Sequence, residues 1–564
     1  NCRYLFPNAF INEMYDKLTG TITNGERFFD REAMVWAIMQ NLPKLAVDSE
    51  FSSIHKYLGE TTGSLKLWQL STRIAYSFDQ YLTYRPELIS KWDNGEDTHW
   101  QAKLWRRIST NAPGTHRARR HRDFLTALGK KGICFEDSYR QRIFVFGIPS
   151  LPPIHIEVLD ALAAHMDIHV FFLNPSKEYW GDIASPYEQS RAMKKKRPAG
   201  IREKELHFER GHPILASMGK MGRDFLSHLM ELDSPQPIEM YDNPPPPERG
   251  ILSVIQNDIF HLNDRGSKIP PLEVSDNYLS RDKSLVINSC HSPMREVEVL
   301  KDTLLSLFDD EAANFAPDEI LVLTPDIEEY APYIEAVFGS GEPAIPYTVA
   351  DRTMRHESAL AGVFLSLLDA APSRFEASRI TDLLEHRQVR RRFGIEDGDL
   401  PLLRRWIINT RINWSLDESG REKLGLPAIK ENTWKAGLDR MLLGYAMPGW
   451  NRAMFADILP YDNIEGGDAL LLGKLSRFVR ELGECADALR QDRTLRQWGE
   501  TLASVLDTFF LPGEESVNEL RAIEETIAGL SELADASGFD GTVDYRTVRA
   551  HLEHAFGESV SSRN

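Results

Sequence analysis

The run Arg142-Ile143-Phe144-Val145-Phe146-Gly147-Ile148 is an apolar segment of strand length that ends in a glycine turn. Residues 154–165 then have helical spacing, and Ile168-His169-Val170-Phe171-Phe172-Leu173 is a second apolar run. A strand, a helix and a strand within about thirty residues are typical of a βαβ unit. Strands connected in this way lie parallel, so the segment predicts a parallel sheet of buried strands.

A second alternation of strands and helices follows between residues 284 and 349. We expect strands at 284–288, 319–323 and 345–349, with helices after Ser292-Pro293 and from Tyr330. Ser292 suits the N-cap of the first of these helices, and Pro293 suits its first turn. The two sections predict an α/β fold class with two parallel sheets in tandem.

Helical spacing dominates the rest of the chain. Before the first sheet we expect helices at 7–18, 27–42 and 65–85. After the second sheet, the helical segments are 360–368, 380–384, 402–408, 438–445, 470–489, 495–510, 517–533 and 545–556. Two tandem sheets with large helical insertions are the layout of a superfamily 1 helicase. We divide the chain into a helical part of the first helicase-like domain (1–140), the rest of that domain (141–250), a second helicase-like domain (251–353) and a helical insertion (354–564).

Charge is distributed unevenly along the 564 residues, which carry a formal net charge of −18. Residues 251–564 hold 53 acidic and 33 basic side chains, whereas residues 101–150 hold 11 basic and 3 acidic ones. A basic region on an otherwise acidic protein fits an anionic ligand held in a restricted channel. The alternative is that acidic surfaces simply keep a large protein soluble.

The helix expected at 65–85 has one apolar face and one polar face. The apolar positions are Leu67, Leu70, Ile74, Phe78 and Leu82. The polar positions are Tyr76, Asp79, Gln80 and Thr83, and Pro86 ends the helix and makes Arg85 extended. Gln can pair with adenine, Asp can accept from cytosine, and Arg can bind guanine or phosphate. The alternative is an ordinary amphipathic helix with a solvated polar face.

The densest basic run is Pro113-Gly114-Thr115-His116-Arg117-Ala118-Arg119-Arg120-His121-Arg122. As the start of a helix, it would point several guanidinium groups outward, and Arg is the preferred phosphate ligand. We therefore name Arg119, Arg120 and Arg122 as possible phosphate contacts. The alternative is a solvated helix face.

The sequence lacks the residues that an active motor needs. A helicase of this layout uses a Gly-rich phosphate loop with a lysine and an Asp-Glu pair on magnesium. No GxxxxGK[ST] occurs, and Gly147-Ile148-Pro149-Ser150 stands where the Asp-Glu pair would follow the first strand. We expect no catalytic and no metal-binding residues. The alternative is an active helicase whose phosphate loop precedes residue 1, since the chain starts at Asn1 without Met and we expect it to be a fragment of a longer protein.

Compartment and membrane association can also be predicted. The four cysteines, Cys2, Cys134, Cys290 and Cys485, are widely separated, which suggests reduced thiols in a cytoplasm. No run of eighteen apolar residues and no signal peptide is present, so we expect neither a membrane span nor secretion.

Several segments, in order along the chain, resemble the RecC family, the gamma subunits of the RecBCD helicase–nuclease, exodeoxyribonuclease V. They are residues 78–86, 147–153, 179–183, 221–224, 290–293 with 295–300, and 441–447. An AddB-type subunit is a further alternative, but it would need an iron–sulfur nuclease domain beyond residue 564, and these segments are closer to RecC.

The resemblance implies a bacterial, cytoplasmic subunit that catalyses nothing itself. It would have inactive helicase-like domains and bind RecB-like and RecD-like motor subunits, which use ATP and magnesium, so that this chain needs no cofactor. It would help to split double-stranded DNA ends, guide the 3′-ending single strand, and scan it for Chi, the sequence that switches the complex from degradation to recombination.

The resemblance also implies which residues read the DNA. Asp79, Gln80, Arg85 and Arg117 match the family at its Chi-reading positions. Four other reading positions differ: they carry Phe6, Asn12, Tyr76 and Ser77, where the best-known member has Leu, Trp, Asp and Leu. Loss of the indole removes a stacking surface worth about 1–3 kcal/mol per base. We therefore expect passage of single-stranded DNA to be retained and the sequence that is read to be altered.

Overall fold

The computed structural model divides into two compact units. One consists of residues 1–26, 78–97 and 113–291, and the other of residues 27–77, 98–112 and 292–564. The structure describes residues 3–20, 26–59, 63–129, 142–185, 187–188, 190, 211–232, 237–247, 250–265, 269–271, 282–309, 315–339, 343–350, 359–447, 454–511, 513 and 516–558. The four consecutive domains expected from the sequence stay a prediction.

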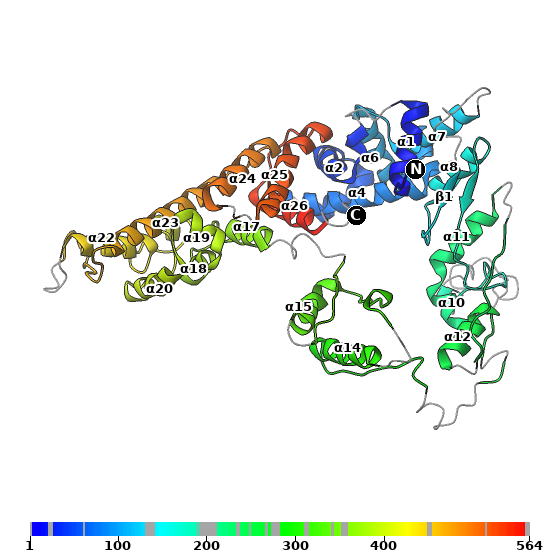
Figure 1. Ribbon diagram of the computed structural model, residues 1–564. Helices are drawn as coiled ribbons and strands as arrows, with labels where there is room; N and C mark the ends of the chain where they lie inside the picture. The colour runs from blue at the N-terminus through cyan, green and yellow to red at the C-terminus, as the bar shows by residue number, and fades with distance from the viewer. Residues whose placement is uncertain are drawn as a thin grey trace. The chain divides into compact units, whose positions relative to one another are not determined.

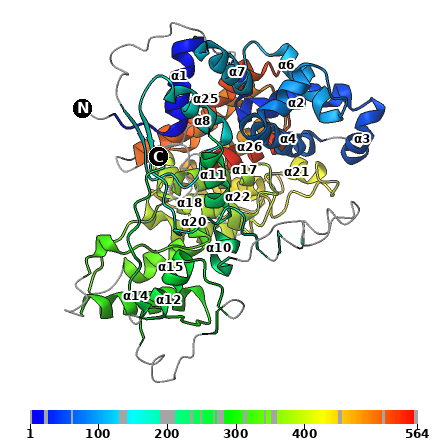
Figure 2. The same ribbon diagram turned by 90° about the vertical axis from the view of Figure 1, so that its right-hand side faces the viewer.

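The first unit combines helices with a two-stranded sheet. Its helices are α1 (Pro7–Thr19), α5 (Pro86–Asp93), α7 (Arg117–Leu128), α8 (Pro153–Ala163), α10 (Pro213–Met218), α11 (Lys220–Met230) and α12 (Ile251–Phe260). Strands β1 (Ile143–Val145) and β2 (Ile168–Val170) run parallel, with Ile143 opposite Ile168. This confirms the βαβ unit, in which α8 connects the two strands. Helices α1, α7 and α8 pack together, as both views show (Figures 1 and 2).

The sheet is covered on only one face by the elements that the structure describes. Ile143 and Ile168 pack against the core of α1, α7 and α8. The opposite face carries Phe144, Phe146 and Phe171, which are 59%, 79% and 51% exposed. The expectation of fully buried strands is therefore wrong for this face, although parallel strands are usually covered on both sides.

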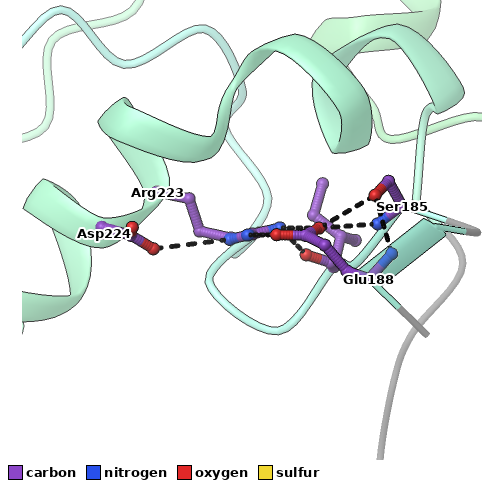
Figure 3. Close-up of polar contacts among 5 residues, drawn as sticks. Ser185, Glu188, Arg223 and Asp224 are labelled. Atoms are coloured by element: carbon purple, nitrogen blue, oxygen red, sulfur yellow. Dashed lines mark hydrogen bonds and ion pairs between the residues drawn. The ribbon is translucent and has the colours of Figure 1, made fainter. Parts of the chain in front are cut away.

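Two of the RecC-like segments meet at α10 and α11. Arg223 on α11 donates to the carbonyl of Ile183 and bonds to Glu188 at 2.8 Å, and Glu188 also accepts from the backbone N–H of Ser185 at 3.0 Å (Figure 3). Burial raises the pKa of Glu188, but the bonds from Arg223 and Ser185 outweigh burial and lower this pKa to about 2. These contacts attach the segment that contains Ile183, Ser185 and Glu188 to helix α11.

The second unit is helical in its described residues. Its helices are α2 (Arg31–Leu45), α3 (Ser52–Leu58), α6 (Trp100–Asn111), α14 (Pro293–Phe308), α15 (Ile327–Phe338), α17 (Ala359–Ala370), α18 (Ala377–Glu385), α19 (Arg387–Phe393), α20 (Leu400–Asn409), α21 (Glu418–Glu422), α22 (Trp434–Ala446), α23 (Asp468–Leu489), α24 (Leu495–Phe509), α25 (Val517–Ser537) and α26 (Tyr545–Glu558). Short 3₁₀ turns lie at Glu26–Phe29, Ser49–Phe51, Pro317–Glu319 and Asp397–Asp399. All eight helical segments expected after residue 354 are confirmed.

Helix α4 (Ser64–Tyr84) crosses the division of the chain, which falls between Ser77 and Phe78. The helix expected at 65–85 is therefore confirmed. Ile74, Phe78 and Leu82 are buried as expected. Nearer the start of the helix, Trp68 and Ser71 are the buried positions instead of Leu67 and Leu70, which are only partly covered.

The second parallel sheet is not present among the described residues. Segments 284–288, 319–323 and 345–349 contain no strand, although the helices that alternate with them, α14 and α15, form and share a small core. Ile287 is 87% exposed and Leu323 is 82% exposed. The strand predictions are wrong here, because a strand needs a neighbouring strand to take up its backbone hydrogen bonds.

None of the described helices combines the length and the apolar character that crossing a membrane requires. In the same part of the chain, no three His, Cys, Asp or Glu side chains gather in a way that could hold a metal ion.

Candidate nucleic-acid interface

Asp79, Thr83 and Arg117 meet at the end of α4. The Arg117 guanidinium lies 3.0 Å from the Asp79 carboxylate and donates to the Thr83 hydroxyl at 3.1 Å. The Arg117 side chain is 43% exposed and that of Asp79 is 21% exposed. Because a guanidinium carries five N–H donors, these two contacts leave donors for a further partner. The structure therefore brings together two of the predicted reading residues.

The packing of α5 on α4 sets the position of Arg85. Phe78 and Tyr81 lie edge-on to the buried indole of Trp92, with ring centroids 6.1 and 5.7 Å away. Pro86 occupies the first turn of α5, so α4 stops at Tyr84 as expected. Arg85 stands between the two helices with φ −143° and ψ 55°, and its side chain is exposed.

Helix α7 begins directly after His116, and Arg117 is its first residue. The Nδ1 atom of His116 accepts a hydrogen bond from the backbone N–H of Arg119 at 3.2 Å, which caps the helix. Its Nε2 atom lies 2.9 Å from the carboxylate of Asp93, the last residue of α5. The helix start expected in the basic run is thus confirmed.

The three other arginines of this helix have different surroundings. Arg120 is buried, bonds to Asp16 of α1 at 2.7 Å and lies over the ring of Tyr15. The expectation that its guanidinium points outward to a phosphate is therefore wrong, because Arg120 faces the contact between α1 and α7. Arg119 is exposed, and Arg122 is exposed and contacts the Ser90 hydroxyl at 3.4 Å.

A second buried histidine, His121 of α7, contacts both α8 and α1. His121 Nε2 lies 2.7 Å from Glu157 of α8, and its Nδ1 lies 3.1 Å from the hydroxyl of Tyr15 of α1. Burial raises the pKa of the Tyr15 hydroxyl. Nearby, burial and then the positive charge of Arg117 lower the pKa of His155 to about 4. The Tyr15 hydroxyl and the His155 ring are therefore neutral near pH 7.

The remaining predicted positions are accessible but are not joined into one cluster by their contacts. Phe6 is 69% exposed just before α1, and Asn12 is exposed on α1. On α4, Tyr76 is 53% exposed, Gln80 is partly exposed, and Ser77 donates to the Arg73 carbonyl at 3.0 Å. Tyr76 and Ser77 belong to the second unit, whereas Phe6, Asn12 and Gln80 belong to the first.

Three residues of the interface, Thr83, His116 and Asp93, could not be assigned a role from the sequence. Thr83 lies on the expected polar face, and its spacing of four from Asp79 could have indicated a shared partner. His116 caps α7 although Ser, Thr, Asp and Asn are the usual caps. Asp93 contacts His116 across 23 positions, and no local pattern indicates that contact.

Two family models match the chain. The RecC N-terminal domain matches residues 1–262, and the fourth domain of the RecBCD enzyme subunit RecC matches residues 357–560. The first match contains every predicted reading residue.

Curated relatives agree with these models. The chain is 34% identical over 93% of its length to the RecBCD enzyme subunit RecC of Escherichia coli K12, of which it covers 50%. Its identity to the Haemophilus influenzae protein of the same name is 33%, with 94% of this chain and 51% of the relative covered. For the Mycolicibacterium smegmatis protein the identity is 30%, with 90% and 46% covered. The chain thus spans about half the length of the relatives it matches, and it belongs to the RecC family.

Proposed function

We propose that this chain is the DNA-guiding part of a non-catalytic subunit in a RecBCD-type helicase–nuclease. In this proposal it assembles with RecB-type and RecD-type subunits, which use ATP and magnesium, in the bacterial cytoplasm. The complex would process double-stranded DNA ends in break repair and homologous recombination. The names of the matched relatives, each a RecC subunit of the RecBCD enzyme, support the assembly.

The observation that carries the proposal is the Arg117 cluster at the end of α4. The guanidinium is oriented by Asp79 and Thr83 and is still 43% exposed. Arg85 stands exposed at the start of the next helix. Arginines held in a fixed orientation suit guanine edges and phosphates, since the planar fork binds with two N–H groups at once.

Sequence recognition is the finer part of the proposal. Gln80, next to Asp79 in the chain, offers an amide that can pair with adenine. We propose that these side chains read a Chi-like sequence in the 3′-ending strand. The departures at Phe6, Asn12, Tyr76 and Ser77 alter which sequence is read.

The test uses the complex assembled with RecB-type and RecD-type subunits on a linear plasmid of known sequence. Arg85→Ala and Gln80→Ala should leave the rate of duplex unwinding unchanged and weaken the mapped pauses by about tenfold, the cost of one or two lost base contacts. Lys91→Ala is the matched control, because it removes an exposed positive charge from α5 itself. Pauses that stay unchanged in both variants would refute base reading by these side chains.

A separate measurement tests the absence of catalysis. Labelled ATP is titrated into the purified full-length protein with magnesium present. We expect no saturable binding, since the sequence lacks the phosphate loop of an active motor. Tight, magnesium-dependent binding would favour the alternative of an active helicase.

A further inference from the structure

His116 connects the two helices that carry the exposed arginines Arg85 and Arg117. Its side chain is only 5% exposed. Because Nδ1 accepts from the backbone N–H of Arg119, a neutral ring must carry its proton on Nε2. That proton is donated to Asp93, 2.9 Å away. The ring therefore makes two different bonds, one to each helix.

Each bond fixes one end of a helix. The cap at Nδ1 orients the first turn of α7, which begins with Arg117. The bond from Nε2 holds Asp93, the last residue of α5, whose N-cap is Arg85. An eight-residue helix is about 12 Å long and stiff over that length. The tie therefore contributes to the separation of the two arginines, together with the packing of α5 on α4.

The rest of the packing makes this tie effective. Trp92, adjacent to Asp93, is 3% exposed and is held edge-on by Phe78 and Tyr81 of α4. Arg117, the first residue of α7, contacts Asp79 and Thr83 of α4. Helices α4, α5 and α7 thus form a closed loop of contacts, in which the bond of His116 with Asp93 and the contact of Arg122 with Ser90 link α5 to α7.

We propose that His116 is a positioning residue for DNA recognition, acting through Arg117 and Arg85. The inference rests on the proposed function, because it assigns His116 to the same site. The ring is buried and bonds to the backbone of Arg119 and to Asp93, so the role assigned to it is orientation of the two helices. Recognition of base edges depends on side-chain placement to within fractions of an ångström.

Three substitutions separate the two bonds of the ring. His116→Asn keeps an oxygen that can cap α7 but is too short to reach Asp93. His116→Gln places an amide N–H near the position of Nε2 but loses the cap. His116→Ala removes both. In the assembled complex on the linear plasmid, we expect His116→Ala to weaken pausing about fivefold, and each of the other variants to weaken it less.

The control and the readouts distinguish positioning from folding. Thr126→Ala, an exposed change further along α7, should change nothing. The unwinding rate and the melting temperature should stay close to wild type in His116→Asn and His116→Gln, which carry the test if His116→Ala folds poorly. A parallel fall of unwinding, melting temperature and pausing in all three variants would show a purely structural role and overturn the inference.

A double mutant tests whether His116 acts through Arg117. If it does, His116→Ala has little further effect on pausing in an Arg117→Ala background. Independent, multiplicative losses would overturn the inference. If Arg117→Ala alone leaves pausing unchanged, or the wild-type complex does not pause, the proposed function fails instead.

Discussion

The carboxylate of Asp79 lies 3.0 Å from the guanidinium of Arg117, although 38 positions separate these residues in the chain. The pair joins the end of α4 to the start of α7. Thr83, one helical turn beyond Asp79, also accepts a hydrogen bond from Arg117.

Weakening the Asp79–Arg117 pair should affect recognition more than stability. Because Arg117 is partly exposed, Asp79→Asn should cost no more than about 1 kcal/mol of folding free energy. Arg117→Lys should weaken pausing nearly as much as Arg117→Ala, since an ammonium group cannot reproduce the planar fork. Melting curves and pause mapping on the same preparations check both statements. Full pausing by Arg117→Lys would mean that only its charge matters.

Two neighbouring arginines on α7 should behave oppositely. Arg119→Ala should lower the salt dependence of binding to a labelled thymidine oligonucleotide by about 0.7 in the log–log slope, with unchanged stability. Arg120→Ala should lower the free energy of unfolding by about 3 kcal/mol, because it leaves Asp16 without its buried partner. Binding titrations at several salt concentrations and urea unfolding measure these effects. If Arg120→Ala changed the slope of the salt dependence without lowering the free energy of unfolding, Arg120 would contact DNA and not Asp16.

Restoring family residues should change what is read. Tyr76→Asp introduces an acceptor for cytosine, and Asn12→Trp introduces a stacking surface worth about 1–3 kcal/mol per base. Both sites are exposed, so folding should tolerate the changes within about 0.5 kcal/mol. Pause mapping on plasmids of known sequence should show new or shifted pause sites. An identical pause map for both variants would exclude these positions from reading.

Acid should destabilise the second unit through His551. Burial, and then the charge of His554, lower the pKa of His551 to about 4, whereas the unfolded chain protonates it near 6.5. Between these values the unfolded state binds more protons, so stability falls as the pH drops from 6.5 to 4 and loses nothing further from this group below 4. The loss is on the order of 3 kcal/mol.

The variant His551→Phe isolates this contribution. It keeps an aromatic ring between Trp36 and Trp68 and removes the titrating group. Urea midpoints at pH 7 and pH 4.5 should differ less in the variant than in the wild type. His155, whose pKa is also lowered to about 4, remains in both proteins and therefore cancels in this comparison. Equal differences would show that His551 is not the source.

Two helical glycines should respond to alanine with opposite signs. A Cβ on Gly444 would lie 1.8 Å from the carbonyl oxygen of Tyr461, so Gly444→Ala should destabilise by about 1–3 kcal/mol. A Cβ on Gly473 meets nothing within 4 Å, and Gly473→Ala should stabilise by about 0.5–1 kcal/mol. Thermal unfolding measures both. Similar effects of the two changes would contradict the close approach at Gly444.

The helices were predictable because their signal is local. The burial of Ile74, Phe78 and Leu82 on α4 follows directly from their spacing along the chain. The strands expected at 284–288 and 319–323 show the limit of the same reasoning. Apolar β-branched runs favour an extended chain, but pairing depends on a second strand that no local pattern supplies.

The candidate site was predictable only in part. Resemblance to the RecC family indicated Asp79 and Arg117, and the structure brings these two side chains together. Composition alone placed Arg120 with the outward arginines, yet Asp16, 104 positions away, holds it inward. Two adjacent arginines in a basic run look alike in sequence, since only packing decides which one faces the core.

By itself, then, the sequence determined the helices, the parallel βαβ unit and membership of the RecC family. Tertiary structure decided which polar groups meet: Arg117 with Asp79, and His116 with Asp93. A helix forms its backbone hydrogen bonds between residues four positions apart, so the spacing of apolar residues over short distances in the sequence is enough to predict it. A side-chain pair between helices depends on how whole apolar faces pack, and that is settled only when distant segments come together.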